Sequence, residues 1–141
     1  MRFSSNERFE PSGVTAALMD QSTEALRPHE TLLEAFLRLN PGTTPNIAHT
    51  ALARFLFRNV DALKTVGALS GGERLRAALA CAVMGTSPPQ LIILDEPTNH
   101  LDLESVAAVE AALSGYDGAL LVVSHDRDFL EAIGVERELR L

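Results

Sequence analysis

The spacing of apolar residues divides the chain into a mainly helical first part and an alternating strand and helix part. Polar residues interrupted by proline and glycine at 1–13 favour a loop, and the short apolar run at 14–19 predicts a strand. Apolar residues at intervals of three and four then predict helices within 22–68. Thr31 and Glu34 have the spacing of a capping box, which places the start of one of these helices.

The second part of the chain has the pattern of a βαβ unit. A helix is expected to begin after Ser70 and to end at Gly85. Continuous apolar runs at 91–94 and 119–123 are typical of parallel strands that are buried on both faces. A helical pattern at 103–114 separates these runs, so the two strands are expected to be parallel neighbours.

Composition limits the classes of function. The 141 residues carry 12 lysines and arginines against 19 aspartates and glutamates, a net charge of −7, so no direct nucleic-acid binding is expected. The longest apolar run, at 77–84, is far shorter than the ~20 residues that cross a membrane, so no membrane insertion is expected. Cys81 is the one cysteine, which excludes an intrachain disulfide. These properties favour a cytoplasmic globular protein.

Acidic and histidine side chains follow the two predicted parallel strands. Asp95 and Glu96 come directly after the first strand, and His125 follows the second. Ligands of open α/β sheets bind beyond the carboxyl ends of the strands. One carboxylate could hold Mg²⁺, the other could activate a water, and the histidine could contact a phosphate. Taken one at a time, the same residues also fit a solvated strand end and an ordinary loop histidine.

Ser70-Gly71-Gly72-Glu73 stands at the start of a predicted helix. The glycines leave backbone N–H groups accessible, and the partial positive charge of a helix N-terminus attracts phosphate. A simple turn and helix cap explains the four residues equally well when they are considered alone.

Taken together, three blocks in this order closely resemble the nucleotide-binding domain of ABC ATPases. Residues 69–73 resemble the signature motif, 91–102 the Walker B strand with its D-loop, and 123–126 the switch-histidine loop. Gln21 is similar to the Q-loop glutamine. The sequence of residues 98–102 most resembles that of the ABC-F subfamily. Members of this subfamily are soluble proteins with two such domains, and many of them act on ribosomes.

The resemblance implies an α/β fold, namely an incomplete P-loop NTPase sheet of the ABC type. Helices would cover both faces of this parallel sheet, and a helical subdomain would be attached to it. Residues 1–21 would form a partial strand and the Q-loop, and 22–68 the helical subdomain. Residues 69–141 would contain the signature helix, Walker B, the D-loop and the switch histidine. The implied partners are a second ABC ATPase domain, packed head to tail, and the ribosome through the full-length protein.

The resemblance also implies ATP and Mg²⁺ as cofactors and a role for each matching residue. Asp95 would hold Mg²⁺, with Gln21 sensing the metal and the water. Glu96 would polarise the attacking water, and His125 would contact the γ-phosphate. The remaining matches would meet the nucleotide of the second domain or line the dimer seam: Ser70, Gly71, Gly72, Glu73 and Asp102.

The family's Walker A loop, G-x-x-x-x-G-K-[ST], has no counterpart in the 141 residues. Lys64 is the one lysine and follows leucine, and the glycine pair Gly67 and Gly72 is followed by Glu73. The chain alone is therefore expected not to hydrolyse ATP. Two alternatives to an ABC-F-like protein stay open: a fragment of a transporter ATPase subunit, and an interaction module that donates its signature motif in trans.

The missing Walker A strand would also leave a gap in the sheet. In the family this strand lies beside the strand that leads to the switch histidine. The strand at 119–123 and a final strand expected at 135–141 would therefore both lack a neighbour. Because an apolar edge strand pairs readily with other chains, we expect self-association, poor solubility or a partner polypeptide that fills the gap.

Overall fold

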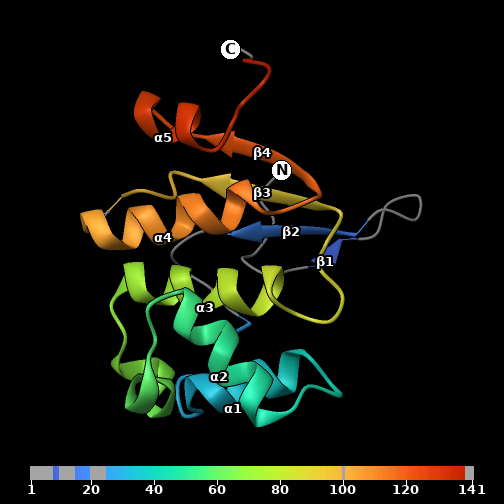
Figure 1. The fold of residues 1–141 in the computed structure, drawn as a ribbon, viewed down its shortest axis with the longest axis vertical. Helices are drawn as coiled ribbons and strands as arrows, with labels where there is room; N and C mark the ends of the chain where they lie inside the picture. The colour runs from blue at the N-terminus through green and yellow to red at the C-terminus, as the bar shows by residue number, and fades with distance from the viewer. Residues whose placement is uncertain (1–7, 10–14, 20–24, 100, 139–141) are drawn as a thin grey trace.

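The computed structural model describes residues 8–9, 15–19, 25–99 and 101–138 (Figure 1). Its sheet has the strand order β1-β2-β3-β4. Strands β2, β3 and β4 are mutually parallel, and β1 pairs antiparallel with β2. The strands are β1 (Arg8–Phe9), β2 (Ala16–Met19), β3 (Leu91–Asp95) and β4 (Ala119–Val123).

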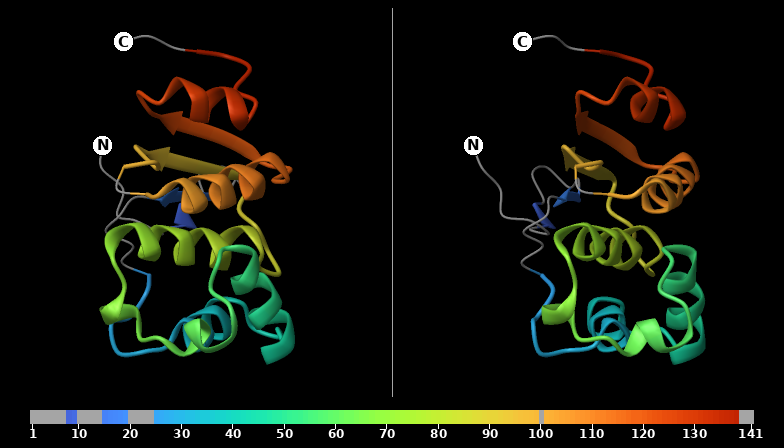
Figure 2. Two further views of the ribbon diagram at one scale, coloured as in Figure 1. Left: turned by 60° about the vertical axis from the view of Figure 1, so that its left-hand side comes forward. Right: turned by 90° about the vertical axis from the view of Figure 1, so that its left-hand side faces the viewer.

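Within the residues that the structure describes, five α-helices and two short 3₁₀ helices surround or extend from this sheet. Helix α3 lies between the sheet and the pair α1 and α2 (Figures 1 and 2). Helices α4 and α5 lie next to the part of the sheet that β3 and β4 form. The helices are α1 (Leu32–Leu39), α2 (Pro45–Arg54), α3 (Gly71–Val83), α4 (Leu103–Ser114), α5 (Arg127–Ala132), η2 (Asn59–Leu63) and η3 (Val66–Ala68).

Local capping chemistry places the helix starts that the sequence predicts. Thr31 and Glu34 form a complete capping box at the start of α1, and Ser70 and Glu73 form another at the start of α3. Each box satisfies two backbone N–H groups that a helix start would otherwise leave unpaired. The prediction of a loop over 1–13 is wrong at β1. A two-residue strand is too short to produce a periodic pattern in the sequence.

Helix α3 is the centre of the core. Its buried residues include Leu75, Leu79 and Cys81, which pack with side chains from the sheet and from α1 and α2. Burial raises the pKa of the Cys81 thiol to about 12, so this cysteine is a neutral core residue. Neighbouring Asn40, at the end of α1, is also buried and donates from its amide to the carbonyls of Phe36 and Cys81 at 3.1 and 3.0 Å. These hydrogen bonds join α1 to α3.

Strand β4 is more exposed than the sequence predicts. Leu121 is 50% exposed and Val123 is 53% exposed, so the expectation that 119–123 is buried on both faces is wrong. A continuous apolar run shows that a strand can be covered, but it does not show what covers it. In the described part of the chain β4 pairs on one side only, with β3. Residues 135–138 form no strand, and 139–141 lie outside the described residues.

The edge of β4 leads to a prediction about association. We expect the 141-residue chain to self-associate with rising concentration in sedimentation velocity, because an apolar edge strand offers unpaired backbone groups to other chains. Leu121→Lys should reduce this association, since charged side chains on an edge oppose strand pairing. Leu103→Lys is the control, because Leu103 is 90% exposed on α4 instead of on the sheet edge. A stable, monodisperse monomer at all concentrations would contradict the prediction.

Candidate functional site

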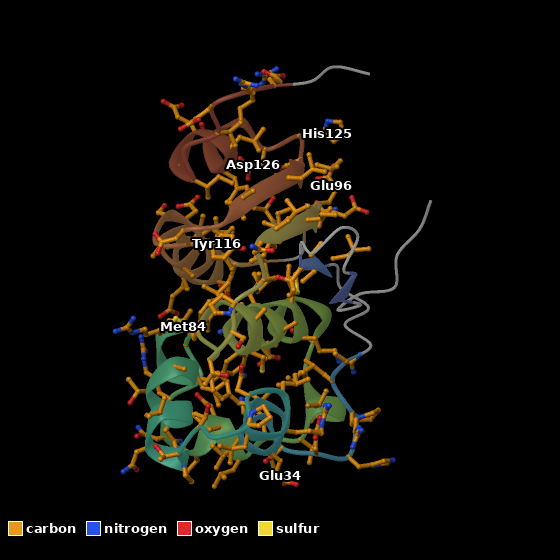
Figure 3. The ribbon with its side chains drawn as sticks, turned by 90° about the vertical axis from the view of Figure 1, so that its right-hand side faces the viewer. Glu34, Met84, Glu96, Tyr116, His125 and Asp126 are labelled. Carbon is orange, nitrogen blue, oxygen red and sulfur yellow. The ribbon has the colours of Figure 1, made fainter. Side chains whose placement is uncertain are left out.

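Glu96 and His125 lie together at the carboxyl ends of two neighbouring parallel strands. Glu96 directly follows β3, and its backbone N–H donates to the carbonyl of Val123 at 2.7 Å, which continues the pairing of β3 with β4. The Nε2 atom of His125 lies 3.5 Å from the Oε1 atom of Glu96 (Figure 3). The sheet topology therefore brings these two predicted catalytic residues within contact distance.

The backbone of Glu96 adopts an uncommon conformation. Its φ is +47°, in the left-handed region that residues with a side chain rarely occupy. Such a conformation persists only where the surroundings impose it, and here the hydrogen bond to Val123 provides one such restraint. The Glu96 side chain is 27% exposed and the His125 side chain is 98% exposed, so both remain accessible to a ligand.

The backbone on either side of His125 is fixed by capping interactions. The N–H of Asp126 donates to the Ser124 hydroxyl at 3.0 Å, and the Asp126 carboxylate accepts from the N–H of Phe129 at 3.0 Å. The Phe129 side chain is fully buried. The loop therefore holds the backbone of His125 in place while it leaves the imidazole exposed.

Asp95, the predicted metal ligand, is exposed at the end of β3. Among the described residues, no group of three or more histidine, cysteine, aspartate or glutamate side chains forms a ready-made metal cage. Mg²⁺ in nucleotide sites commonly uses one or two carboxylates together with phosphate oxygens and water, so a single accessible carboxylate fits this ion. Gln21, the second predicted metal residue, lies outside the described residues.

Four residues that resemble the signature motif and the D-loop, Ser70, Gly72, Glu73 and Asp102, line a cavity of about 260 Å³, called the signature cavity from here on. At the start of α3, the Ser70 hydroxyl accepts from the N–H of Glu73, and the Glu73 carboxylate accepts from the N–H of Ser70, both at 3.1 Å. The Asp102 carboxylate caps α4 by accepting from the N–H of Ser105 at 2.8 Å. The cavity is lined by Ser70, Gly72, Glu73, Arg76, Leu101, Asp102 and Ser105.

Hydrogen bonding lowers the pKa of the Asp102 carboxyl in the signature cavity. The hydrogen bonds from Ser105 lower the pKa of the Asp102 carboxyl, and the positive charge of Arg76 lowers it further. Gly71 begins α3 but does not line the cavity. Asp95, Glu96 and His125 do not line it either, so the predicted residues form two separate groups.

Two polar residues of the signature cavity, Arg76 and Ser105, were not predicted as site residues from the sequence. Both are buried although both are polar. Arg76 lies within the predicted helix among residues that pack into the core, and an arginine at such a position is unusual enough to be noticed. Ser105 carries no comparable signal, because serine is common in the first turn of a helix.

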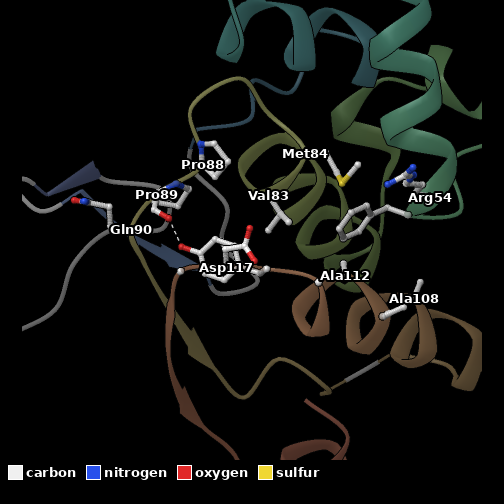
Figure 4. A pocket seen from close by; sticks show the side chains of 14 residues that line it. Arg54, Val83, Met84, Pro88, Pro89, Gln90, Ala108, Ala112 and Asp117 are labelled. Carbon is white, nitrogen blue, oxygen red and sulfur yellow. Dashed lines mark hydrogen bonds between the residues drawn. The ribbon is translucent and has the colours of Figure 1, made fainter. Parts of the chain in front are cut away.

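A larger cavity of about 640 Å³ lies between α2, the end of α3 and the second half of α4 (Figure 4). Its lining is mainly apolar and includes Val83, Met84 and Ala112. The Tyr116 hydroxyl at its wall donates to the carbonyl of Pro89. None of the predicted site residues lines this cavity.

Known proteins share the sequence pattern of this chain and its arrangement of strands and helices. The sequence profile described as "ABC transporter" matches residues 4–99, about two thirds of the chain. The chain belongs to the ABC transporter family. The structural comparison also confirms the α/β fold with a parallel sheet. The ATP-binding cassette MJ0796, solved as a dimer bound to ADP and phosphate, matches with a TM-score of 0.66 and 26% identity. The match covers 83% of this chain and 55% of that cassette.

Curated relatives within the ABC family are ABC-F-type ATP-binding proteins. YdiF of Bacillus subtilis is 43% identical over 122 residues, which cover 86% of this chain and 19% of the relative. The energy-dependent translational throttle protein EttA of Escherichia coli is 45% identical over 92 residues, which cover 65% of this chain and 16% of the relative. The chain thus spans less than a fifth of either relative. No helix in its described residues is long and apolar enough to cross a membrane.

Proposed function

We propose that this chain forms the signature and Walker B part of an ABC-F-like cassette that couples ATP binding and hydrolysis to action on a partner such as the ribosome. The pairing of Glu96 with His125 at the ends of β3 and β4 carries this proposal. The ribosome is suggested by the translational role in the name of EttA. A transporter ATPase subunit is the alternative, because the family profile itself includes transporters.

The residues at the ends of β3 and β4 would serve a nucleotide bound at this sheet. Asp95 would hold Mg²⁺, which neutralises phosphate charge when bound, and Gln21 would assist it. Glu96 would accept a proton from the attacking water, and its contact with His125 would restrain the carboxylate. His125 is accessible and would donate a hydrogen bond to the terminal phosphate. This assignment places catalysis on one edge of the sheet.

The signature cavity would serve a different nucleotide. Its separation from Asp95, Glu96 and His125 supports a role across an interface, in which α3 contacts ATP held by a second ABC domain packed head to tail. The N–H groups at the start of this 13-residue helix would donate hydrogen bonds to phosphate oxygens. Asp102 would lie at the seam between the two domains. The dimeric state of the solved cassette supports such an arrangement.

We also propose that residues 1–21, 22–68 and 69–141 are the Q-loop part, the helical subdomain and the catalytic part of the cassette. Because the 141 residues contain no Walker A loop, the chain alone would neither retain ATP nor hydrolyse it. It would act in the cytoplasm, without membrane insertion and without direct nucleic-acid contact.

The proposal is tested by complementation. The chain is titrated into a Walker A-containing ABC cassette whose own signature serine has been replaced by arginine, and ATP hydrolysis is measured. We expect hydrolysis to appear with the wild-type chain and to disappear with Ser70→Arg, because the arginine blocks the start of α3. Ser87→Arg, at an exposed serine that does not line the signature cavity, should retain activity.

Two results would contradict this proposal. Hydrolysis that persists with Ser70→Arg would exclude a donated signature. Saturable binding of Mg-ATP at micromolar concentration by the isolated chain, measured by equilibrium dialysis, would show that this chain holds ATP without a Walker A loop.

A further inference from the structure

Arg76 is a charged residue within α3, a helix most of whose residues are buried. It lies in the second turn of α3, and only 9% of its surface is exposed. Its side chain also reaches the lining of the signature cavity, where Glu73 and Asp102 supply two carboxylates. A buried charge is costly unless its surroundings compensate for it, so the contacts of Arg76 indicate what it does.

One side of the guanidinium holds the turn that follows α2. Its Nη1 donates to the carbonyl of Phe55 at 2.7 Å, and its Cζ lies 4.5 Å from the centre of the Phe57 ring. Between these residues Leu56 has a φ of +71°, in the left-handed region. The turn is closed by hydrogen bonds at the helix end, from Leu56 N–H to Ala53 and from Phe57 N–H to Leu52, both at 3.0 Å. An unusual backbone conformation therefore presents both a carbonyl and a ring to Arg76.

The compensation for the charge of Arg76 is incomplete. In the described part of the chain its buried Nε has no hydrogen-bond acceptor, and no carboxylate lies close enough for an ion pair. Burial lowers the pKa of the guanidinium, and the carboxylates of Glu73 and Asp102 act in the opposite direction. Arg76 is thus coupled to both cavity acids through the field of its charge instead of through direct contact.

We propose that Arg76 is a positioning residue of the signature cavity, which anchors the Phe55–Phe57 turn to α3 and offsets the charge of Glu73 and Asp102. Two carboxylates beside the start of α3 would oppose an incoming phosphate, and the positive charge of Arg76 removes much of this repulsion. The effect of Arg76 on nucleotide binding rests on the proposed function. The electrostatic coupling of Arg76 to Glu73 and Asp102 is independent of that function, because it is a property of this chain alone.

Three variants separate charge from packing. Arg76→Met removes the charge and keeps a long side chain. Arg76→Lys keeps the charge but loses the planar contacts with Phe55 and Phe57. Phe57→Leu keeps Arg76 and removes the ring beneath it. Thermal melts identify any variant that fails to fold, so that a folded member of the set can be used for each comparison.

The first measurement is the titration of Asp102 in the isolated chain, followed by carboxyl NMR. We expect the pKa of Asp102 to rise in Arg76→Met and to stay at its wild-type value in Arg76→Lys and Phe57→Leu, because those two variants retain the positive charge. An unchanged Asp102 pKa in folded Arg76→Met would overturn the proposal. This result does not depend on nucleotide or on a second cassette.

The second measurement is the association of the chain with the ATP-loaded cassette of the complementation assay. We expect Arg76→Met to weaken association about tenfold at low salt, with a smaller difference at high salt, because screening reduces charge effects. Equal weakening by Arg76→Met and Phe57→Leu at every salt concentration would show a packing role only and overturn the proposal. If the wild-type chain does not associate, the proposed function fails, and the Asp102 titration still decides the role of Arg76.

Discussion

Replacing Gly85 by alanine is expected to lower the free energy of unfolding by about 3 kcal/mol. A Cβ atom at Gly85 would lie 2.0 Å from the Oδ1 of Asn40 and 2.8 Å from the carbonyl oxygen of Cys81. Asn40 cannot move aside freely, because it is buried and its amide donates to two carbonyls. Its Oδ1 also accepts from the N–H of Thr86 at 3.3 Å. The extra methyl therefore either overpacks the junction of α1 and α3 or breaks buried hydrogen bonds.

Gly115 provides the matched control for the Gly85 variant. It also follows a helix, but the nearest atoms to an added Cβ are the carbonyl oxygens of Ala111 and Ala112, both at 3.8 Å. Its φ is −89°, which any residue adopts, so Gly115→Ala should have little effect. Urea unfolding followed by circular dichroism measures both variants. Similar stability of the Gly85 and Gly115 variants would contradict the prediction, because it would show that the Asn40 side chain can shift without lowering the free energy of unfolding.

A double-mutant cycle shows whether the Asn40 side chain or the Cys81 carbonyl causes the loss of stability in Gly85→Ala. In an Asn40→Ala background the side chain that the new methyl would strike is absent, so Gly85→Ala should cost less than in the wild type. A full cost in that background would instead place the conflict at the carbonyl of Cys81, which the Asn40 substitution does not remove.

The features that the sequence predicts well depend on neighbours close in the chain. The capping boxes at Thr31 and Ser70 join residues three positions apart, so their residue types are sufficient to locate them. The end of α2 has no such signal, because Leu56 occupies the left-handed position where glycine is usual. Its conformation depends on contacts with residues elsewhere in the fold, Arg76 among them.

The same distinction applies to the candidate site. Asp95, Glu96 and His125 could be placed together because the ends of neighbouring parallel strands meet at one edge, whatever the details of packing. Arg76 could not be placed, since its role depends on Phe55 and Phe57, about twenty residues earlier in the chain. The exposure of β4 was mispredicted for the same reason, because an apolar sequence does not specify its covering layer.

Glu96→Gln should lower ATP turnover at least about 100-fold in any assembled cassette that hydrolyses ATP at this sheet edge. Glutamine has the size of glutamate and can still hydrogen bond with His125, but its amide cannot accept a proton from water. The loss should therefore fall on the rate of hydrolysis, while ATP-dependent association is retained. Steady-state turnover and association are measured on the same preparation, with Glu131→Gln as a control at an exposed acid on α5.

The contact between Glu96 and His125 makes this prediction more specific. The two side chains meet at 3.5 Å, and only the glutamate is restrained by an unusual backbone conformation. If Glu96 activates water and His125 contacts phosphate, Glu96→Gln should trap ATP in the assembled cassette, whereas His125→Ala should also weaken ATP retention. Turnover at the wild-type rate in Glu96→Gln would exclude the carboxylate as a base. Identical retention of ATP in the two variants would exclude a phosphate contact by His125.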